Sequence, residues 1–168
     1  MELLIDGYNL IRQSAHLSSL EGLDLERGRQ ALLDKLAGYR RIKGHRITVV
    51  FDGRGSFHLG SRDASHRGIN VVFTKSGEIA DEWIKRRLAE LREGAVVTSD
   101  REIRSHAEKV GVPSISSGDF ERKMEEALYA DLKGIEIDEG GPPMYAKKGP
   151  ARRLSKRERK IKSIWKRL

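Results

Sequence analysis

The sequence lacks cysteine altogether, and its 168 residues include only four prolines and ten aromatic side chains. Without cysteine there is no disulfide framework, iron–sulfur cluster or thiolate zinc site. No apolar run approaches the roughly 20 residues of a membrane span. Strand-like sequence begins at Glu2 and meets an aspartate at Asp6, which leaves no room for a signal peptide. We therefore expect a cytoplasmic protein that does not enter a membrane.

Charge is distributed unevenly along the chain, whose formal net charge is +8. From Lys147 to Leu168 there are eleven Lys and Arg residues and one acid. Residues 1–146 carry twenty-two basic and twenty-four acidic residues, a net charge of −2. The high pI of 9.8 therefore comes from the C-terminal segment. A polycation attached to a nearly neutral body predicts a polyanionic partner, either nucleic acid or an anionic membrane surface.

Short β-rich runs alternate with longer segments of helical period, at a length suited to one domain. This alternation predicts an α/β fold with a mostly parallel sheet covered by helices on both faces. Strands are expected at residues 2–5, 46–51, 69–73, 95–98 and 112–115, and helices at 23–39, 79–91, 101–110 and 117–132. The domain is expected at residues 1–137, a Gly/Pro linker at 138–150 and a basic C-terminal helix or tail at 151–168.

Aspartates follow three of the expected strands. Asp6 ends the first strand, Asp52 follows the second and Asp100 follows the fourth. The carboxyl ends of parallel strands share one edge of a sheet, and sites form there where the strand order reverses. Asp81 lies in the first turns of the helix that should begin at the same edge, on a side from which it can face this cleft.

Carboxylates packed together repel one another unless a cation lies among them. Together with Asn9 these aspartates make an all-oxygen donor set, which suits Mg²⁺ or Mn²⁺ rather than zinc or copper. An ion of this kind typically bridges phosphate oxygens and activates water. Taken singly, an aspartate after a strand can also cap a turn or a helix, and Asp-Gly is itself a turn signal.

Four short motifs carry a family resemblance over residues 1–132. They are Asp6-Gly7-Tyr8-Asn9, Phe51-Asp52-Gly53, Ala80-Asp81-Glu82-Trp83-Ile84 and Thr98-Ser99-Asp100. In this order the motifs resemble the NYN domain, a PIN-like nuclease fold, and its bacterial YacP-like group. The resemblance implies a metal-dependent endoribonuclease whose acidic centre is Asp6, Asn9, Asp52, Asp81 and Asp100.

Within that centre, Asp6, Asp81 and Asp100 are expected to ligate the metal directly, with Asp52 and Asn9 beside or behind them. Ser99 is expected to support Asp100 or to position a phosphate. Metal-activated water can attack without a histidine or lysine base.

Several cations are candidates for RNA contact. Residues 53–68 are expected to form a flexible rim whose Arg54 meets phosphates, although solvation explains any single loop cation equally. Lys85, four residues after Asp81, is expected to neutralise a substrate phosphate or to pair with Asp81.

The C-terminal segment places Leu154, Ile161, Ile164, Trp165 and Leu168 near helical spacing among its cations. Such a stripe can dock on the chain's own domain. Its apolar face is narrow for a membrane surface, so RNA or a ribosome is the favoured partner. The RNA contacts expected here are Arg152, Arg153, Lys156, Arg157 and, by base stacking, Trp165.

The sequence thus predicts a cytoplasmic endoribonuclease that depends on Mg²⁺ or Mn²⁺ and acts on RNA, with mRNA and a ribosome-associated role favoured. Two alternatives stay open. One is a non-catalytic RNA-binding or ribosome-associated factor with a vestigial acidic pocket. The other is a structure-specific DNA nuclease of related architecture.

Overall fold

The computed structural model describes residues 1–53, 63–75, 78–135 and 155–168. In chain order its elements are β1 (Glu2–Asp6), α1 (Gly7–Gln13), α2 (Ala15–Leu23), α3 (Leu25–Lys43), β2 (Arg46–Phe51), β3 (Asp63–His66), β4 (Ile69–Phe73), α4 (Ala80–Glu90), β5 (Gly94–Val97), α5 (Arg101–Lys109), β6 (Ser114–Ile115), α6 (Ser117–Lys133) and α7 (Lys156–Arg167). None of the helices in these ranges is long and apolar enough to cross a membrane. The linker expected at residues 138–150 lies outside them.

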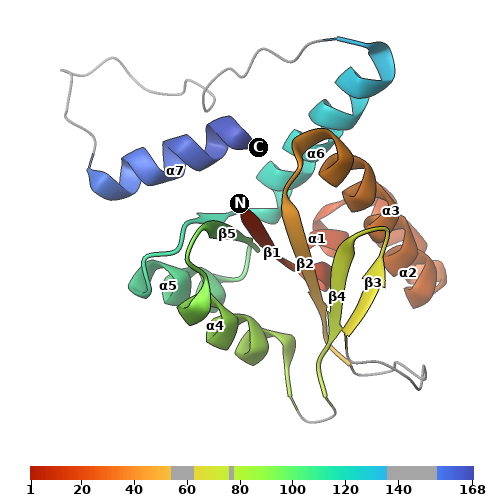
Figure 1. Cartoon of the computed structure of the whole chain (residues 1–168). Coiled ribbons are helices and arrows are strands. Elements are labelled where there is room, and N and C mark those ends of the chain that lie inside the picture. Colours follow the sequence, from red (N-terminus) through yellow and green to blue (C-terminus); the bar gives the residue numbers. More distant parts are fainter. Residues whose placement is uncertain (54–62, 76–77, 136–154) are drawn as a thin grey trace.

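The strands form one sheet in the order β3-β4-β2-β1-β5-β6, with helices on both faces (Figure 1). All neighbouring pairs are parallel except β3 with β4. The predicted mostly parallel α/β fold is therefore confirmed. The chain leaves β1 towards β2 on one side and returns to β5 on the other, so the strand order reverses beside β1. This is the position at which α/β sheets bind ligands.

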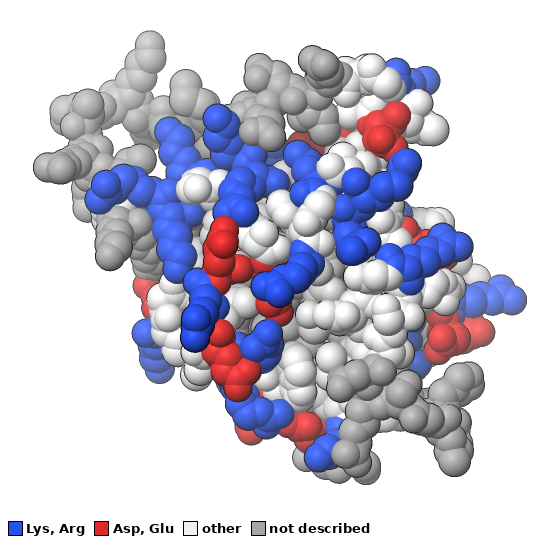
Figure 2. All heavy atoms as spheres, viewed as in Figure 1, with Lys and Arg blue, Asp and Glu red and all other residues white. Residues whose placement is uncertain are grey.

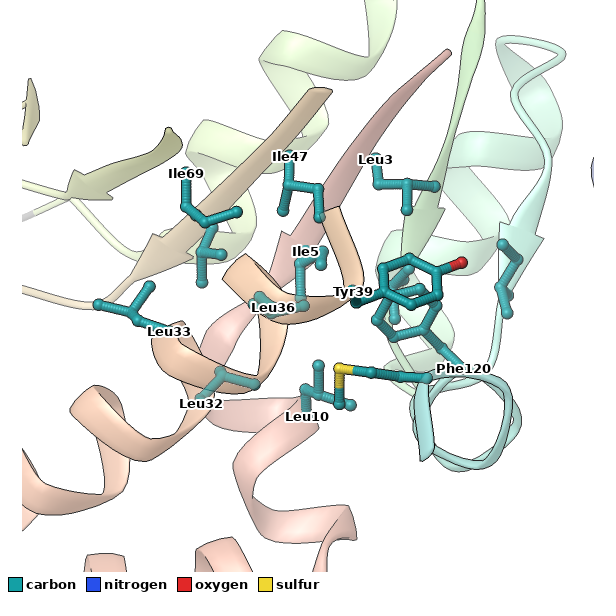
Figure 3. Close-up of a cluster of buried hydrophobic side chains, with 14 of the residues drawn as sticks. Leu3, Ile5, Leu10, Leu32, Leu33, Leu36, Tyr39, Ile47, Ile69 and Phe120 are labelled. Atoms are coloured by element: carbon teal, nitrogen blue, oxygen red, sulfur yellow. The ribbon is translucent and has the colours of Figure 1, made fainter. Parts of the chain in front are cut away.

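Alternate residues of the central strand pack into two cores. Leu3 and Ile5 face the larger core, which the helices α1, α3 and α6 cover (Figure 3). Leu4 faces the smaller core with Ile84 of α4 and Ile103 of α5. Because these side chains are fully buried, each contributes roughly 1.5–3 kcal/mol of transfer free energy. The two cores hold β1 rigidly, and β1 carries Asp6 at its end.

The helix α3 turns one apolar side towards the larger core, except in its first turn. Leu32 and Leu36 are fully buried, but Leu25 is 36% exposed because it lies in the first turn of the helix. Arg29 takes the inward position in its place and is only 5% exposed. The helix begins after an Asp24 cap. A buried cation on this face was not expected from the sequence.

Two further differences lie near the site. The segment between Asp6 and the first expected helix contains α1 and α2, for which no helix was predicted. The loop expected at residues 53–68 contains β3, an antiparallel partner of β4. β3 is a short polar edge strand without the β-branched residues that would have marked it. The expected rim is therefore wrong for residues 63–66, and Arg54 lies outside the described part of the chain.

The helix α7 packs against the domain. Ile164 and Leu168 are 6% and 3% exposed and belong to the larger core, with Trp165 partly buried beside them. Tyr39 donates a hydrogen bond to the Leu168 carbonyl at 2.9 Å. The docking that the apolar stripe allowed is thus present. Arg152 and Arg153 lie outside the described residues, as do the side chains of Lys156 and Arg157.

Candidate active site

The parallel register brings the ends of β1 and β5 together. Ile5 lies opposite Val97, so the next residues of β1 and β5, Asp6 and Thr98, become neighbours. The Thr98 hydroxyl donates to Asp6 Oδ2 at 3.1 Å, and the Asn9 N–H donates to Asp6 Oδ1 at 3.2 Å. Asp6 is therefore fixed at the switch point of the sheet, with only 8% of its surface exposed.

Asp6 lies in an environment that disfavours its charge. Burial is the largest cause and raises the pKa of Asp6 to about 6. The hydrogen bonds from Asn9 and Thr98 lower this pKa in part. The charges of Asp81 and Asp100 raise it again. Burial disfavours the ionised form of this carboxyl, and a cation beside it would favour that form.

Asp81 shares this repulsion. Burial raises the pKa of Asp81, and the charge of Asp100 is the next cause. Lys85 lowers this pKa, whereas Glu102 and Asp52 add to the increase. Lys85 Nζ donates to Glu102 at 3.0 Å, so the pairing partner of Lys85 is Glu102, within electrostatic range of Asp81. The structure thus brings Asp6, Asp52, Asp81 and Asp100 into one electrostatic cluster.

The carboxylates of this cluster influence one another electrostatically, but they do not converge on one position as metal ligands would. In the described ranges, no group of three or more His, Asp or Glu side chains stands ready to hold a metal ion. Asp100 also caps α5, because its Oδ1 accepts from the N–H groups of Glu102 and Ile103 at 2.8 and 3.0 Å. The donor chemistry fits Mg²⁺, which usually keeps several waters and takes few protein ligands. Direct ligation by Asp6, Asp81 and Asp100 stays a prediction.

Asn9 ties three segments together behind the carboxylates. Its Oδ1 accepts from the Ser99 N–H at 2.8 Å and from the Ser117 hydroxyl at 2.7 Å. Ser99 Oγ in turn accepts from the Ser117 N–H at 3.2 Å, and Thr98 Oγ1 accepts from the Asp100 N–H at 3.1 Å. Asn9 therefore positions the loop that carries Asp100. The contact of Ser117 with Asn9 and that of Thr98 with Asp6 had no signal in the sequence, because these partners are 108 and 92 residues apart in the chain.

The two Asp-Gly pairs are explained by close packing. A Cβ on Gly7 would lie 2.3 Å from the Phe51 ring, and one on Gly53 would lie 2.0 Å from the Thr74 carbonyl oxygen. The Gly53 N–H also donates to Thr74 Oγ1 at 3.1 Å. Glycine at both positions lets the chain turn tightly after each aspartate. The motif is therefore more than a turn signal.

Sequence reasoning missed the buried pair of Arg29 and Tyr8 beside this edge. Arg29 Nε donates to the Tyr8 hydroxyl at 2.8 Å, and its Nη2 donates to the same oxygen. The guanidinium lies 5.4–5.9 Å from the ring centres of Tyr8, Phe51 and Phe73. From the sequence, a cation three residues before buried Leu32 is expected to be exposed to solvent. Only the structure shows that Arg29 is buried.

The raised pKa of Asp6 predicts how stability depends on pH. The folded protein holds the Asp6 proton up to about pH 6, whereas the unfolded chain releases it near 3.8. Stability supplied by Asp6 is therefore lost as the pH rises through this window. A shift of about two pKa units corresponds to at most ~3 kcal/mol. In metal-free buffer we expect Asp6→Asn to be more stable than the wild type at pH 7.5, with this advantage absent at pH 4.

Urea unfolding at both pH values measures this difference. Asp34→Asn is the control of opposite sign, because a hydrogen bond with His66 lowers the pKa of the exposed Asp34. That variant should lose stability relative to the wild type as the pH rises. If the stability of the wild type and of Asp6→Asn changed with pH in the same way, Asp6 would not be a buried carboxyl whose charge lacks compensation.

Comparison with known proteins agrees with this geometry. The sequence profile of the YacP-like NYN domain matches residues 3–166 and so reaches into α7. The uncharacterized protein YacP of Bacillus subtilis (strain 168) is 38% identical over 102 residues. That match covers 58% of this chain and 59% of YacP, less than two thirds of its length.

Two crystal structures of Rae1 (YacP) from Bacillus subtilis, one of them a mutant, share the fold at 30% identity. Their TM-scores are 0.66 and, for the mutant, 0.67. The matches cover 80% and 79% of this chain, and 78% and 79% of those chains. With the strand-end aspartates at the switch point of the sheet, these matches show that the chain belongs to the YacP-like NYN domain family, a family of PIN-like nuclease fold.

Proposed function

We propose that this protein is a cytoplasmic endoribonuclease that depends on a divalent metal and cleaves RNA phosphodiester bonds at the carboxylate edge of its sheet. The observation that carries the proposal is the cluster of Asp6, Asp81 and Asp100, in which the charges of Asp81 and Asp100 raise the pKa of Asp6 and the charge of Asp100 raises the pKa of Asp81. A stable fold gains nothing from this arrangement alone. A cation bound among the carboxylates would relieve it.

The donor atoms indicate which ion fits. All candidates are carboxylate oxygens, which favour Mg²⁺ or Mn²⁺. Such an ion would act as a Lewis acid that activates water and neutralises phosphate charge. Asp6, Asp81 and Asp100 would hold it, and Asp52 would add negative charge from the end of β2. Asn9 would keep the loop before Asp100 in place through its contacts with Ser99.

Family membership favours a nuclease over the other functions considered. A non-catalytic RNA-binding factor would have no need of a buried, high-pKa carboxyl at the switch point. A DNA nuclease would use the same acidic centre, so the distinction rests on the substrate. Cleavage of an RNA and a DNA version of one sequence decides between these two.

The first test of this function is removal of single carboxylates. Asp81→Asn and Asp100→Asn should each reduce RNA cleavage at least 100-fold with Mg²⁺ or Mn²⁺ present, because a metal ligand and its charge are lost. Both proteins should still fold, since each change removes one of several repelling charges. Cleavage of a labelled single-stranded RNA at saturating metal measures the effect, and melting curves check the fold.

The matched control for these variants is Asp131→Asn, which removes an exposed carboxylate of α6 that pairs with Arg41. It should cleave RNA like the wild type. Full activity in Asp81→Asn and Asp100→Asn would show that the site is assigned wrongly. No cleavage of any RNA by the wild type would instead favour the binding factor.

A second part of the proposal concerns α7. Its apolar side docks on the domain, and Arg159, Lys162 and Lys166 are exposed on the other side. In Figure 2, Lys and Arg gather over this upper part of the molecule. We assign this basic face of α7, made by those three residues, to RNA or ribosome binding, because cations there release counterions from a polyanion.

The basic face of α7 and the carboxylates lie at opposite ends of the sheet. α7 contacts His45, Glu93 and Gly111, which precede β2, β5 and β6. The carboxylates follow the strands at the other end, about 17–20 Å away for strands of this length. A short oligonucleotide at the carboxylates therefore does not reach α7. The partner of α7 must be a long or folded RNA.

Removing the basic face of α7 tests this assignment without disturbing the docked side. The triple variant Arg159→Gln, Lys162→Gln, Lys166→Gln should bind a long single-stranded RNA more weakly. If each side chain contacts one phosphate, the slope of log K against log salt should be flatter by about 2, at roughly 0.7 per phosphate. Binding of a trinucleotide should change far less, because it does not span the distance.

Fluorescence anisotropy across a salt series measures both RNAs. The control is Arg86→Gln, Arg104→Gln, Lys133→Gln, which removes the same charge from exposed positions on α4, α5 and α6. Equal slopes for the two triple variants would mean that α7 contributes only general charge and its docking. Truncation of α7 is a poorer test, because it would uncover the larger core at Ile164 and Leu168.

A further inference from the structure

Tyr8, two residues after Asp6, contacts the buried side chain of Arg29 from α3. The Arg29 side chain is buried among aromatic rings, and its acidic partner is Glu26 at 3.0 Å, which is 62% exposed. Burying a guanidinium costs several kcal/mol unless its donors and charge are matched. Much of that match comes from the Tyr8 oxygen, to which Arg29 donates through Nε and Nη2. Arg29 therefore fixes the position of the Tyr8 hydroxyl.

The hydroxyl of Tyr8 is left as a donor by this arrangement. A phenolic oxygen that accepts two N–H groups directs its own proton away from them. In the ranges that the structure describes, no side chain or carbonyl accepts that proton. The Tyr8 ring is only partly buried, at the end of α1 that meets the carboxylate edge. A polar ligand at this edge can therefore receive a hydrogen bond from Tyr8.

A second cation lies over the same ring. Arg12 Cζ is 5.6 Å from the centre of the Tyr8 ring, and the Arg12 side chain is 67% exposed. Among the described residues, its one acidic contact is Glu21 at 4.0 Å, the outer limit of an ion pair. The Tyr8 ring lies 5.2 Å from the ring of Phe51 at the end of β2, so this group lies on the β2 side of the carboxylate cluster. Asp81 and Asp100 lie on the other side, towards β5.

We propose that Tyr8 and Arg12 form a phosphate subsite that holds a phosphodiester neighbouring the scissile one. The proposal rests on the proposed function and extends it to the substrate. A polyanion that approaches four carboxylates needs positive charge beside them, and the fixed Tyr8 donor with the exposed Arg12 guanidinium supplies the groups that bind phosphate oxygens. Arg29 is a positioning residue, because it acts on the ligand through Tyr8.

Substrates that lack one charge at a time test this subsite. A short single-stranded RNA is prepared with one uncharged methylphosphonate linkage at each position around the cleavage site, beside a 2′-O-methyl sugar. Reference RNAs carry the 2′-O-methyl sugar alone. At one linkage, loss of charge should raise the wild-type KM about tenfold, as expected for a hydrogen bond to a charged group. Tyr8→Phe and Arg12→Gln should raise KM similarly on natural RNA and leave kcat within about twofold.

The decisive result is non-additivity. In Tyr8→Phe and Arg12→Gln, the methylphosphonate at that one linkage should cost nothing further, since the contact is already lost. At the other linkages the effects should add. The controls are Tyr129→Phe, on a ring that is 60% exposed in α6, and Arg104→Gln, and both should match the wild type. Melting curves identify any loss of fold in Tyr8→Phe, and Arg12→Gln, at an exposed position, then decides the question.

Binding measured in EDTA separates this proposal from the proposed function. If the wild type cleaves RNA but both variants keep its KM, or all effects add at every linkage, the subsite is absent and Arg12 is merely a solvated cation. If no RNA is cleaved, the proposed function fails. The subsite is then judged from Kd for the same RNAs, which should show the same tenfold losses and the same non-additivity.

Discussion

The burial of Asp6 at the end of the central strand is the constraint from which the arrangement of the site follows. Both cores hold β1, so Asp6 cannot move away from its neighbours. Thr98 and Asn9 hold its two oxygens, and the same residues then reach the loop that presents Asp100. One buried carboxyl thus organises the ends of β1 and β5. Its raised pKa is the electrostatic cost of that position.

The two ends of the sheet carry opposite charge. Carboxylates gather where the parallel strands end, and the exposed cations of α7 lie where the strands begin. A polyanion such as RNA would be repelled at the first end and attracted at the second. An enzyme so built would bind a large RNA away from its centre and depend on local groups, such as Tyr8 and Arg12, to bring one strand to the carboxylates.

The strand-end aspartates could be predicted because their positions depend on a local pattern, a buried strand followed by an acid. The contacts of Asn9 could not, because its partners Ser99 and Ser117 are 90 and 108 residues away. Arg29 was missed for a different reason. Periodicity treats every charge as solvated, and only the rings around Arg29 make its burial tolerable. β3 was not predicted because a polar edge strand lacks the alternation of apolar residues by which strands are recognised.

Binding of a divalent metal at the carboxylate edge underlies the proposed function. A crystal of the full chain soaked in Mn²⁺, with anomalous diffraction recorded at the manganese edge, measures this binding. We expect an anomalous peak between Asp6, Asp81 and Asp100, with at least one carboxylate oxygen at about 2.0–2.3 Å and waters completing the coordination. An empty carboxylate edge at millimolar Mn²⁺, or a peak elsewhere on the protein alone, would contradict it.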